Sequence, residues 1–388
     1  MVDSSRHFLP LAVIRRTLDS LPYAKLNVLH WHVVDSQAFP FVSEHIPSMS
    51  ATGAYTPDHV YTVADVKEIV AYAGERGIRV IPEFDTPGHV SRGWESLGVL
   101  TDCFDDETGR FSHTGPLNPT LDKTFETLTT LWADVLAAFA PEKFVHIGGD
   151  EVWHTPTHSC WQSNPQVQAW LKQHPEVDGF SGLETLFERR VLDMLHAAGA
   201  SVAIWQEIFD NGAMVPSDTV IDVWKGGWPG AAPEMAKVTA AGFHAVLSAP
   251  YYLNHIAYGA DWWQYYQVEP ANFTGGAAAE ASKVLAGIKA CFWSEWIDGT
   301  NLVSRAWPRA AGVAERAWSS KDVTNGMDAE HRIDALRCKL IARGLNAEPI
   351  GGCNNVGCNT NDTRLYFPGA AGHCAQEWVP AYSGVGAA

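Results

Sequence analysis

The chain has 388 residues, 46% of them hydrophobic, which is enough to bury a large core and too apolar for a disordered chain. Acidic side chains outnumber basic ones, 44 against 27, so the formal net charge is −17. This balance, with no concentrated basic patch, argues against nucleic acid or an anionic membrane as a partner. No stretch approaches the ~18 uninterrupted apolar residues of a membrane helix, so we expect no membrane span.

Short apolar, β-branched runs recur along the chain and predict strands. The first is a stub at Val2–Ser4. The seven clear strands that we predict after it are Lys25–Asp35, Arg79–Asp85, Lys143–Gly148, Ser201–Gln206, Thr219–Trp224, His244–Ser248 and Ala290–Trp293.

Helical patterns separate these runs. One helix is opened by the capping box Thr62-x-x-Asp65 and ends at Gly77. The other helices that we predict are an apolar stripe from Leu121 to Phe139, a helix capped by Ser181-x-x-Glu184, and a last helix over Arg309–Trp318. Strands that alternate with helices indicate a parallel sheet, and eight of them fit a (β/α)₈ TIM barrel better than an open doubly wound sheet.

Two regions of the chain differ in character. We expect the barrel over residues 1–350, with a truncated first strand, and a disulfide-stapled, Cys-rich tail over residues 351–388, where periodicity is lost. The glycine-rich signatures G-x-G-x-x-G and G-x-x-x-x-G-K-[ST] are both missing from the sequence, which removes the commonest nucleotide-binding interpretations.

The seven cysteines lack the close paired spacing that zinc sites usually show. An odd count leaves one thiol unpaired, and Cys291, inside an apolar run, is the residue we expect to be buried and free. Sequons at Asn272 and Asn361 fit a secreted or lumenal protein. Because the first residues lack the apolar region of a signal peptide, we expect the natural N-terminus to lie upstream, with this chain a fragment or a truncated gene model.

Chemistry-bearing residues gather where the predicted strands end. In a parallel barrel, catalytic side chains lie at the carboxyl ends of the strands. The residues found at those ends are Asp35, Glu83, Asp85 and His89, Asp150 and Glu151, Trp205 and Glu207, Trp224, Tyr252 and Asn254, and Trp293 and Glu295. Seven such ends in register are hard to explain by packing alone.

Each of these signals also has a plainer interpretation. An isolated Asp150-Glu151 pair is more often an ordinary acidic loop, and the Gly-Gly-Asp-Glu-Phe signature of cyclic-dinucleotide synthases has Phe where this chain has Val152. Most of the sixteen tryptophans are expected to be core residues, although those at strand ends suit the C–H faces of a sugar. Taken singly, His32 and His89 are better explained as structural histidines.

Several motifs together resemble the catalytic domain of glycoside hydrolase family 20, most closely its lysosomal-type β-N-acetylhexosaminidases. The resemblance extends to about Gly352. The motifs that carry it are Asp3-Ser-Ser-Arg-His-Phe-Leu-Pro10, Leu29-His-Trp-His-Val-Val-Asp35, Pro82-Glu-Phe-Asp-Thr-Pro-Gly-His89, His146-Ile-Gly-Gly-Asp-Glu151, Trp205-Gln-Glu-Ile-Phe209, Ser248-Ala-Pro-Tyr-Tyr-Leu-Asn254, Trp293-Ser-Glu295 and Ala314-Glu-Arg-Ala-Trp-Ser319.

The resemblance implies removal of terminal, non-reducing GlcNAc or GalNAc with retention, by a substrate-assisted route in which the sugar's own acetamide forms an oxazolinium ion. By the match, Asp150 would orient the acetamide and Glu151 would be the general acid and then the base, with a raised pKa. Tyr252 would bind the acetamide oxygen. His89 and Asp35 would form a dyad that tunes Glu151.

The same resemblance implies the substrate-binding set and further features. Substrate would be held by Arg6, Trp205, Trp224, Asn254, Trp293 and Glu295. Family pairing implies the disulfides Cys103–Cys160 and Cys338–Cys353, and we add a guess of Cys358–Cys374. His255 stands where a relative's arginine can favour anionic substrates, so cleavage of acidic sugars is not expected.

For partners, we expect a glycan or glycoconjugate with terminal β-GlcNAc or β-GalNAc, no cofactor or metal, and a homodimer. The location that we expect is lysosomal, vacuolar or secreted. The alternative function is a catalytically silent N-acetylhexosamine-binding protein on the same barrel. Such a protein would be expected to lose the acid, whereas Glu151 is present here.

Overall fold

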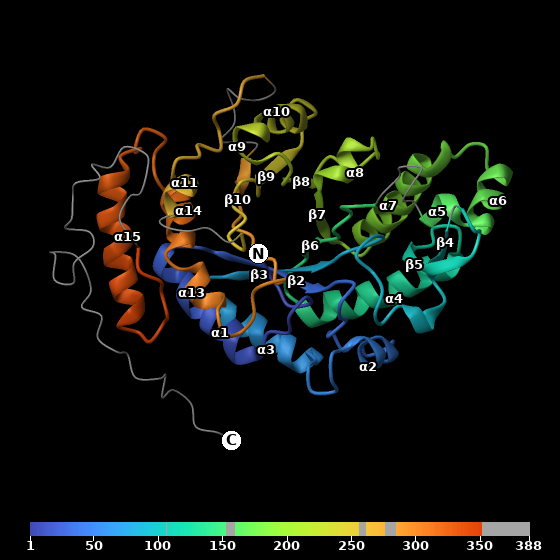
Figure 1. The fold of residues 1–388 in the computed structure, drawn as a ribbon, viewed down its shortest axis with the longest axis horizontal. Coiled ribbons are helices and arrows are strands. Elements are labelled where there is room, and N and C mark those ends of the chain that lie inside the picture. The colour runs from blue at the N-terminus through green and yellow to red at the C-terminus, as the bar shows by residue number, and fades with distance from the viewer. Residues whose placement is uncertain (106, 153–159, 256–260, 276–284, 351–388) are drawn as a thin grey trace.

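The computed structural model describes residues 1–105, 107–152, 160–255, 261–275 and 285–350. Eight parallel strands form one sheet in the order β1-β2-β3-β6-β7-β8-β9-β10 (Figure 1). Their bounds are β1 Val2–Asp3, β2 Val28–Val34, β3 Arg79–Phe84, β6 Phe144–His146, β7 Ser201–Trp205, β8 Val220–Val223, β9 His244–Leu247 and β10 Leu285–Ile288.

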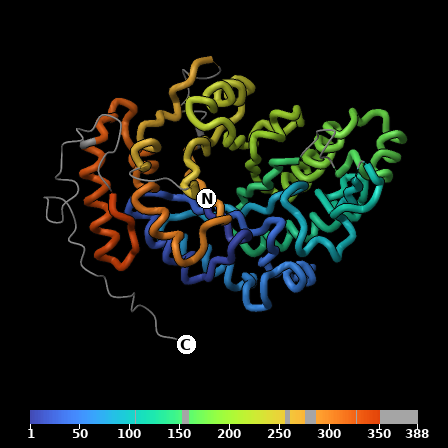
Figure 2. Tube along the Cα trace, viewed as in Figure 1, coloured from blue at the N-terminus to red at the C-terminus, as the bar shows by residue number. Residues whose placement is uncertain are grey.

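The two ends of this sheet meet at β1. On one side β1 pairs with β2, and on the other Val2 forms a parallel bridge with Phe292, just beyond β10. The Asp3 N–H donates to the Phe292 carbonyl at 3.1 Å, and the Phe292 N–H donates to the Met1 carbonyl at 3.0 Å. The predicted (β/α)₈ TIM barrel is therefore confirmed, and the N-terminus lies in the middle of the fold (Figure 2).

Helices surround the barrel and bury its outer face. The helix bounds are α1 Leu11–Ser20, α2 Ser48–Gly53, α3 Val63–Gly74, α4 Asp122–Phe139, α5 Cys160–Ser163, α6 Pro165–Gln173, α7 Gly179–Ala197, α8 Gln206–Asp210, α9 Gly227–Gly230, α10 Ala232–Ala240, α11 Trp262–Tyr266, α13 Leu302–Ala306, α14 Arg309–Trp318 and α15 Gly326–Ile341, with short 3₁₀ turns η1 Leu21–Ala24 and η2 Glu95–Leu97. Within the described residues, no helix is long and apolar enough to cross a membrane.

Strand alternation decides which side chains enter the barrel. In β2, Trp31 faces outward, 5.9 Å from the Phe139 ring of α4, while His30 and His32 lie among polar residues of neighbouring strands. Two of the helix predictions are confirmed at their start or bounds, although α3 ends at Gly74 and not at the predicted Gly77. The capping box of Thr62 and Asp65 is present at α3, and α14 has the predicted bounds.

Two expectations differ from the structure, and one element was missed. The strand predicted at Ala290–Trp293 pairs as β10 over residues 285–288, and only single bridges continue beyond it. Ser181 does not cap α7, because the helix already begins at Gly179. The antiparallel hairpin of β4 Leu100–Phe104 and β5 Phe111–Leu117 was not predicted. The expected tail lies outside the described residues.

Candidate active site

The turn after β6 brings two carboxylates to the mouth of the barrel. Its backbone has positive φ at Gly148 (76°), Gly149 (90°) and Glu151 (57°). A Cβ at Gly148 would lie 1.8 Å from Asp85 Oδ1. Because only glycine avoids that clash, the turn can pack directly onto Asp85. The close approach expected of the Gly-Gly pair is present.

The two carboxylates of this turn have different surroundings. Asp150 is buried, with 6% of its surface exposed, and its Oδ1 accepts no hydrogen bond from the described residues. The Glu151 side chain is 43% exposed. A buried, unpartnered acceptor needs a donor, whereas an exposed carboxyl can exchange protons with water. The pair can therefore hold a polar group and move a proton at the same place.

His89 connects this turn to the end of β2. Its Nδ1 lies 3.2 Å from Asp35, and its Nε2 lies 3.5 Å from Glu151 Oε2 and 3.7 Å from Asp150 Oδ2. Arg6 Nη2 lies 2.7 Å from Asp35 Oδ2. The predicted dyad of His89 and Asp35 is thus assembled beside Glu151.

Charge in this cluster moves the pKa values of His89 and Glu151. Burial alone would lower the pKa of His89, but Asp150, Asp85 and Asp35 hold it well above its ordinary value. The hydrogen bond with His89 lowers the pKa of Glu151, although partial burial opposes this. The expected raised pKa of Glu151 is therefore wrong, because a cationic His89 stabilises the carboxylate.

Aromatic side chains from four strand ends form one wall. The Trp205 ring lies 6.0 Å from Trp293 and 6.5 Å from Trp224, and Trp224 lies 6.3 Å from Tyr252. Burial raises the pKa of Tyr252 far above its ordinary value, so its hydroxyl stays neutral and can donate a hydrogen bond. The four aromatics that the sequence placed in the site are thus brought together.

Two residues that were not in the predicted site hold Trp224 in place. Glu207 Oε2 accepts a hydrogen bond from Trp224 Nε1 at 2.8 Å, and Lys225 Nζ lies 2.9 Å from the other oxygen of Glu207. Gln206 Oε1 accepts from the backbone N–H groups of Trp224 and Lys225. Both residues follow Trp205 at a strand end and belong to the motif Trp205-Gln-Glu-Ile-Phe209, but neither signal gave them a role in the site.

The remaining predicted residues lie around this wall. The Arg6 guanidinium lies 4.8 Å from the Trp293 ring and 3.0 Å from Asp3, which leaves its side chain 11% exposed. Glu295 is exposed next to Trp293 and acts electrostatically on Arg6. Asn254 is half-buried, and its Oδ1 has no hydrogen-bond partner among the described residues.

Asp85 is a buried acid that the predicted site omitted. Its Oδ1 accepts from the Gly149 N–H at 2.9 Å. Burial, followed by the charge of Asp150, raises its pKa well above the ordinary value. A neutral Asp85 carboxyl can donate a hydrogen bond to Asp150. The sequence showed it at a strand end but not its contact with the turn.

Some of these polar groups are close enough to share a cation. His30, Glu83 and His146 form one such set, and Asp85, His89 and Asp150 form another. Positive charge already lies next to both sets, because Lys289 Nζ is 3.0 Å from His30 and Arg6 is 3.5 Å from His89. These positive charges would repel a metal ion. The absence of a metal stays a prediction.

A cavity of about 410 Å³ lies at the other end of the barrel. It is lined by residues that begin strands, such as Val28, Arg79 and Phe144, together with polar side chains of α1 and apolar side chains of α13. None of the residues predicted for the site lines it, although polar residues of the barrel interior do: His30, His146, Asp222 and Lys289. The predicted site therefore lies at the carboxyl ends of the strands and not in this cavity.

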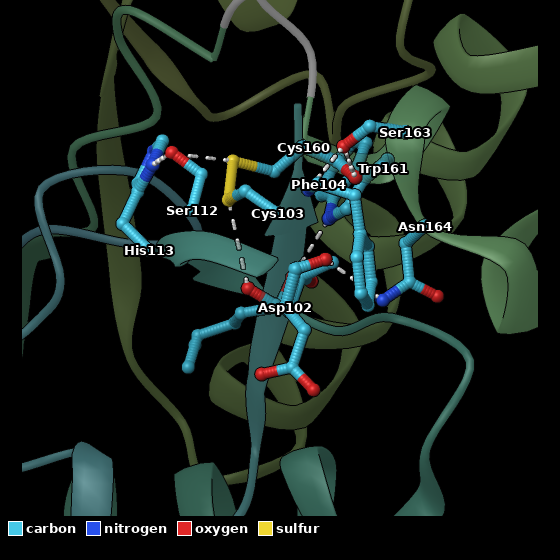
Figure 3. Close-up of a disulfide and its surroundings, with 11 residues drawn as sticks. Asp102, Cys103, Phe104, Ser112, His113, Cys160, Trp161, Ser163 and Asn164 are labelled. Atoms are coloured by element: carbon cyan, nitrogen blue, oxygen red, sulfur yellow. Dashed lines mark hydrogen bonds between the residues drawn. A yellow bond between two sulfur atoms is a disulfide. The ribbon is translucent and has the colours of Figure 1, made fainter. Parts of the chain in front are cut away.

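A disulfide anchors the chain beyond Glu151. Cys103 of β4 is bonded to Cys160 at the start of α5, as the resemblance implied, and His113 Nε2 lies 3.8 Å from Cys160 Sγ (Figure 3). Cys291 is free and buried, as expected. Cys338 is disulfide-bonded, but its predicted partner and the guessed pair of Cys358 and Cys374 involve residues outside the described part.

Comparison with known proteins identifies relatives along most of the chain. The family model described as "Glycosyl hydrolase family 20, catalytic domain" matches residues 1–321. The human β-hexosaminidase subunit β is 44% identical over 92% of this chain and 63% of its own length, and the bovine subunit α is 46% identical over 90% and 65%. The chitobiase of Flavobacterium johnsoniae superposes with a TM-score of 0.75 at 29% identity, over 89% of this chain and 51% of that one. The chain thus spans less than two thirds of these proteins.

Proposed function

The chain belongs to glycosyl hydrolase family 20, and from this premise we propose that it is a β-N-acetylhexosaminidase that removes terminal, non-reducing GlcNAc or GalNAc. The observation that carries the proposal is the turn after β6. There a buried, unpartnered Asp150 oxygen lies beside a solvent-facing Glu151 and the aromatic wall. The names of the relatives, β-hexosaminidase and chitobiase, support the same activity.

In this proposal the two acids divide the reaction. Asp150 accepts the N–H of the sugar's acetamide, whose carbonyl oxygen attacks the anomeric carbon as the glycosidic bond breaks. Glu151 gives its proton to the departing oxygen, and an oxazolinium ion forms. Glu151 then takes a proton from the water that opens this ion, which restores the acetamide and retains the configuration. Tyr252 donates to the acetamide oxygen, a geometry that a neutral hydroxyl permits.

The remaining site residues bind the substrate or adjust the pKa of Glu151. Trp205, Trp224 and Trp293 form the apolar wall of the acetamide pocket, where buried aromatic rings cover the methyl group and the sugar face. The substrate hydroxyls are bound by Arg6, Asn254 and Glu295. His89, held by Asp35, sets the pKa of Glu151.

The location and assembly belong to the same proposal. A disulfide such as Cys103–Cys160 persists in oxidising compartments, and an acid with a lowered pKa works best at acidic pH. Both support a lysosomal, vacuolar or secreted enzyme. The expected homodimer rests on the family resemblance, and light scattering of the purified protein tests it: a monomeric mass would contradict it.

Release of chromophore from aryl N-acetyl-β-glucosaminide and N-acetyl-β-galactosaminide tests the activity. The wild type should cleave both substrates and leave the aryl β-glucoside intact. Glu151→Gln should lower kcat by about 10²–10⁴. A folded wild-type protein that binds GlcNAc but releases no chromophore would favour the silent sugar-binding alternative.

A further inference from the structure

The barrel interior beneath the site is built around one buried carboxylate. Glu83 of β3 has no exposed surface. Its Oε1 accepts a hydrogen bond from Trp205 Nε1 at 2.8 Å, and its Oε2 lies 3.0 Å from His32 Nδ1 and 2.8 Å from His30 Nε2. TIM-barrel interiors are usually filled by bulky apolar side chains. A buried ion pair adds little to the stability of a fold. The Glu83 carboxylate therefore needs an explanation other than stability.

Two series of side-chain contacts start from Glu83 and lead to the candidate active site. One passes through the Trp205 indole to the aromatic wall. The other passes through His32, whose Nε2 lies 3.0 Å from Asp35 Oδ2, and then through the dyad to Glu151. Burial alone would lower the pKa of His32, but Glu83, Asp35 and Asp3 raise it to about 9. His32 is therefore an imidazolium held between two carboxylates.

We propose that Glu83 is a positioning residue that fixes the acetamide wall and the proton-transfer residues in one geometry, without touching the substrate. The inference rests on the proposed function. One carboxyl group holds the indole of Trp205 through one oxygen and the ring of His32 through the other. A shift of Glu83 therefore moves both halves of the site together.

Steady-state kinetics with aryl N-acetyl-β-glucosaminide measure the effects of the two series of contacts separately. Trp205→Phe removes the indole donor to Glu83 together with part of the aromatic wall, and should raise KM. His32→Asn removes the imidazolium between Glu83 and Asp35 and its ring contact with Trp293, and should lower kcat more than it raises KM. Glu83→Leu leaves no acceptor for either contact, so it should do both and lower kcat/KM by about 10², the scale of a misplacement of 1 Å. In the Trp205→Phe background, Glu83→Leu should raise KM no further, because the two changes break the same contact.

The matched control is Asp134→Asn. Asp134 of α4 is also a buried carboxylate, bonded to Ser43 and His45, and contacts none of the site residues. The Asp134→Asn substitution should leave kcat and KM unchanged. Circular dichroism checks that each variant is folded. If Glu83→Leu does not fold, Glu83→Gln carries the test: its amide oxygen still accepts from the Trp205 indole while its N–H₂ faces His32, so it should lower kcat with a smaller change in KM.

Each result has a definite meaning. An inactive wild type would overturn the proposed function and this inference with it. With an active wild type, unchanged kinetics in folded Glu83→Leu or Glu83→Gln, additive KM effects of Glu83→Leu with Trp205→Phe, or a His32→Asn variant that alters KM alone would overturn only the positioning role of Glu83.

Discussion

The neutral state of Asp85 gives the sharpest prediction, because two substitutions of this residue should differ. Its Oδ1 accepts from the Gly149 N–H at 2.9 Å, and its raised pKa lets the protonated carboxyl donate to Asp150. Asparagine has the same shape and offers one acceptor and one donor. Asp85→Asn should therefore keep both bonds, with kcat/KM within a few-fold of wild type and an unfolding free energy within about 1 kcal/mol.

Asp85→Ala removes both bonds. A buried N–H left unsatisfied costs about 1–3 kcal/mol, and a hydrogen bond to a charged group contributes about 1.5–3 kcal/mol. We expect a loss of about 3–5 kcal/mol in urea unfolding and a fall in kcat/KM of about 10², because Asp150 is no longer held. Equal damage from Asp85→Asn and Asp85→Ala would refute the reasoning, since it would mean that the charge of Asp85 is needed.

Three further predictions concern the same turn and its anchors. Glu151 must begin protonated and its pKa is lowered by His89, so His89→Asn should move the basic limb of the kcat/KM profile to higher pH; a limb that stays in place contradicts this. Gly149→Ala places a Cβ 2.2 Å from another side chain at φ +90° and should lower the unfolding free energy by about 3 kcal/mol in urea, whereas an unchanged value would show that the turn adjusts. Replacing both Cys103 and Cys160 by serine opens a link across 57 residues and should cost about 2–4 kcal/mol, which an unaltered urea midpoint would disprove.

Local sequence patterns predicted those parts of the fold that depend on local physics. The capping box at Thr62 and the bounds of α14 follow from residues within one or two turns of a helix. The β4–β5 hairpin was missed because its alternation is short and interrupted by Gly115 and Pro116. The cap assigned to Ser181 was wrong because Glu184 turns inward, where it accepts from Asn211.

The candidate site was predictable as a set of strand ends but not as a set of contacts. A parallel barrel brings its carboxyl ends together whatever the loops do, so Asp35, His89 and Glu151 could be grouped in advance. The bond from Asp85 to Gly149 depends on how two loops pack, and no spacing in the sequence encodes it. The pKa of Glu151 depended in turn on the charge of its neighbour.

The measurement that tests the acetamide mechanism most directly is kcat/KM for aryl N-acyl-β-glucosaminides with zero, one, two or three fluorines on the acyl methyl. Fluorine withdraws electrons and weakens the carbonyl oxygen as a nucleophile while the leaving group stays the same. If the substrate's own amide attacks, with Asp150 steering it and Glu151 supplying the proton, the rate should fall steeply with each fluorine. A rate that does not change along the series would contradict the account.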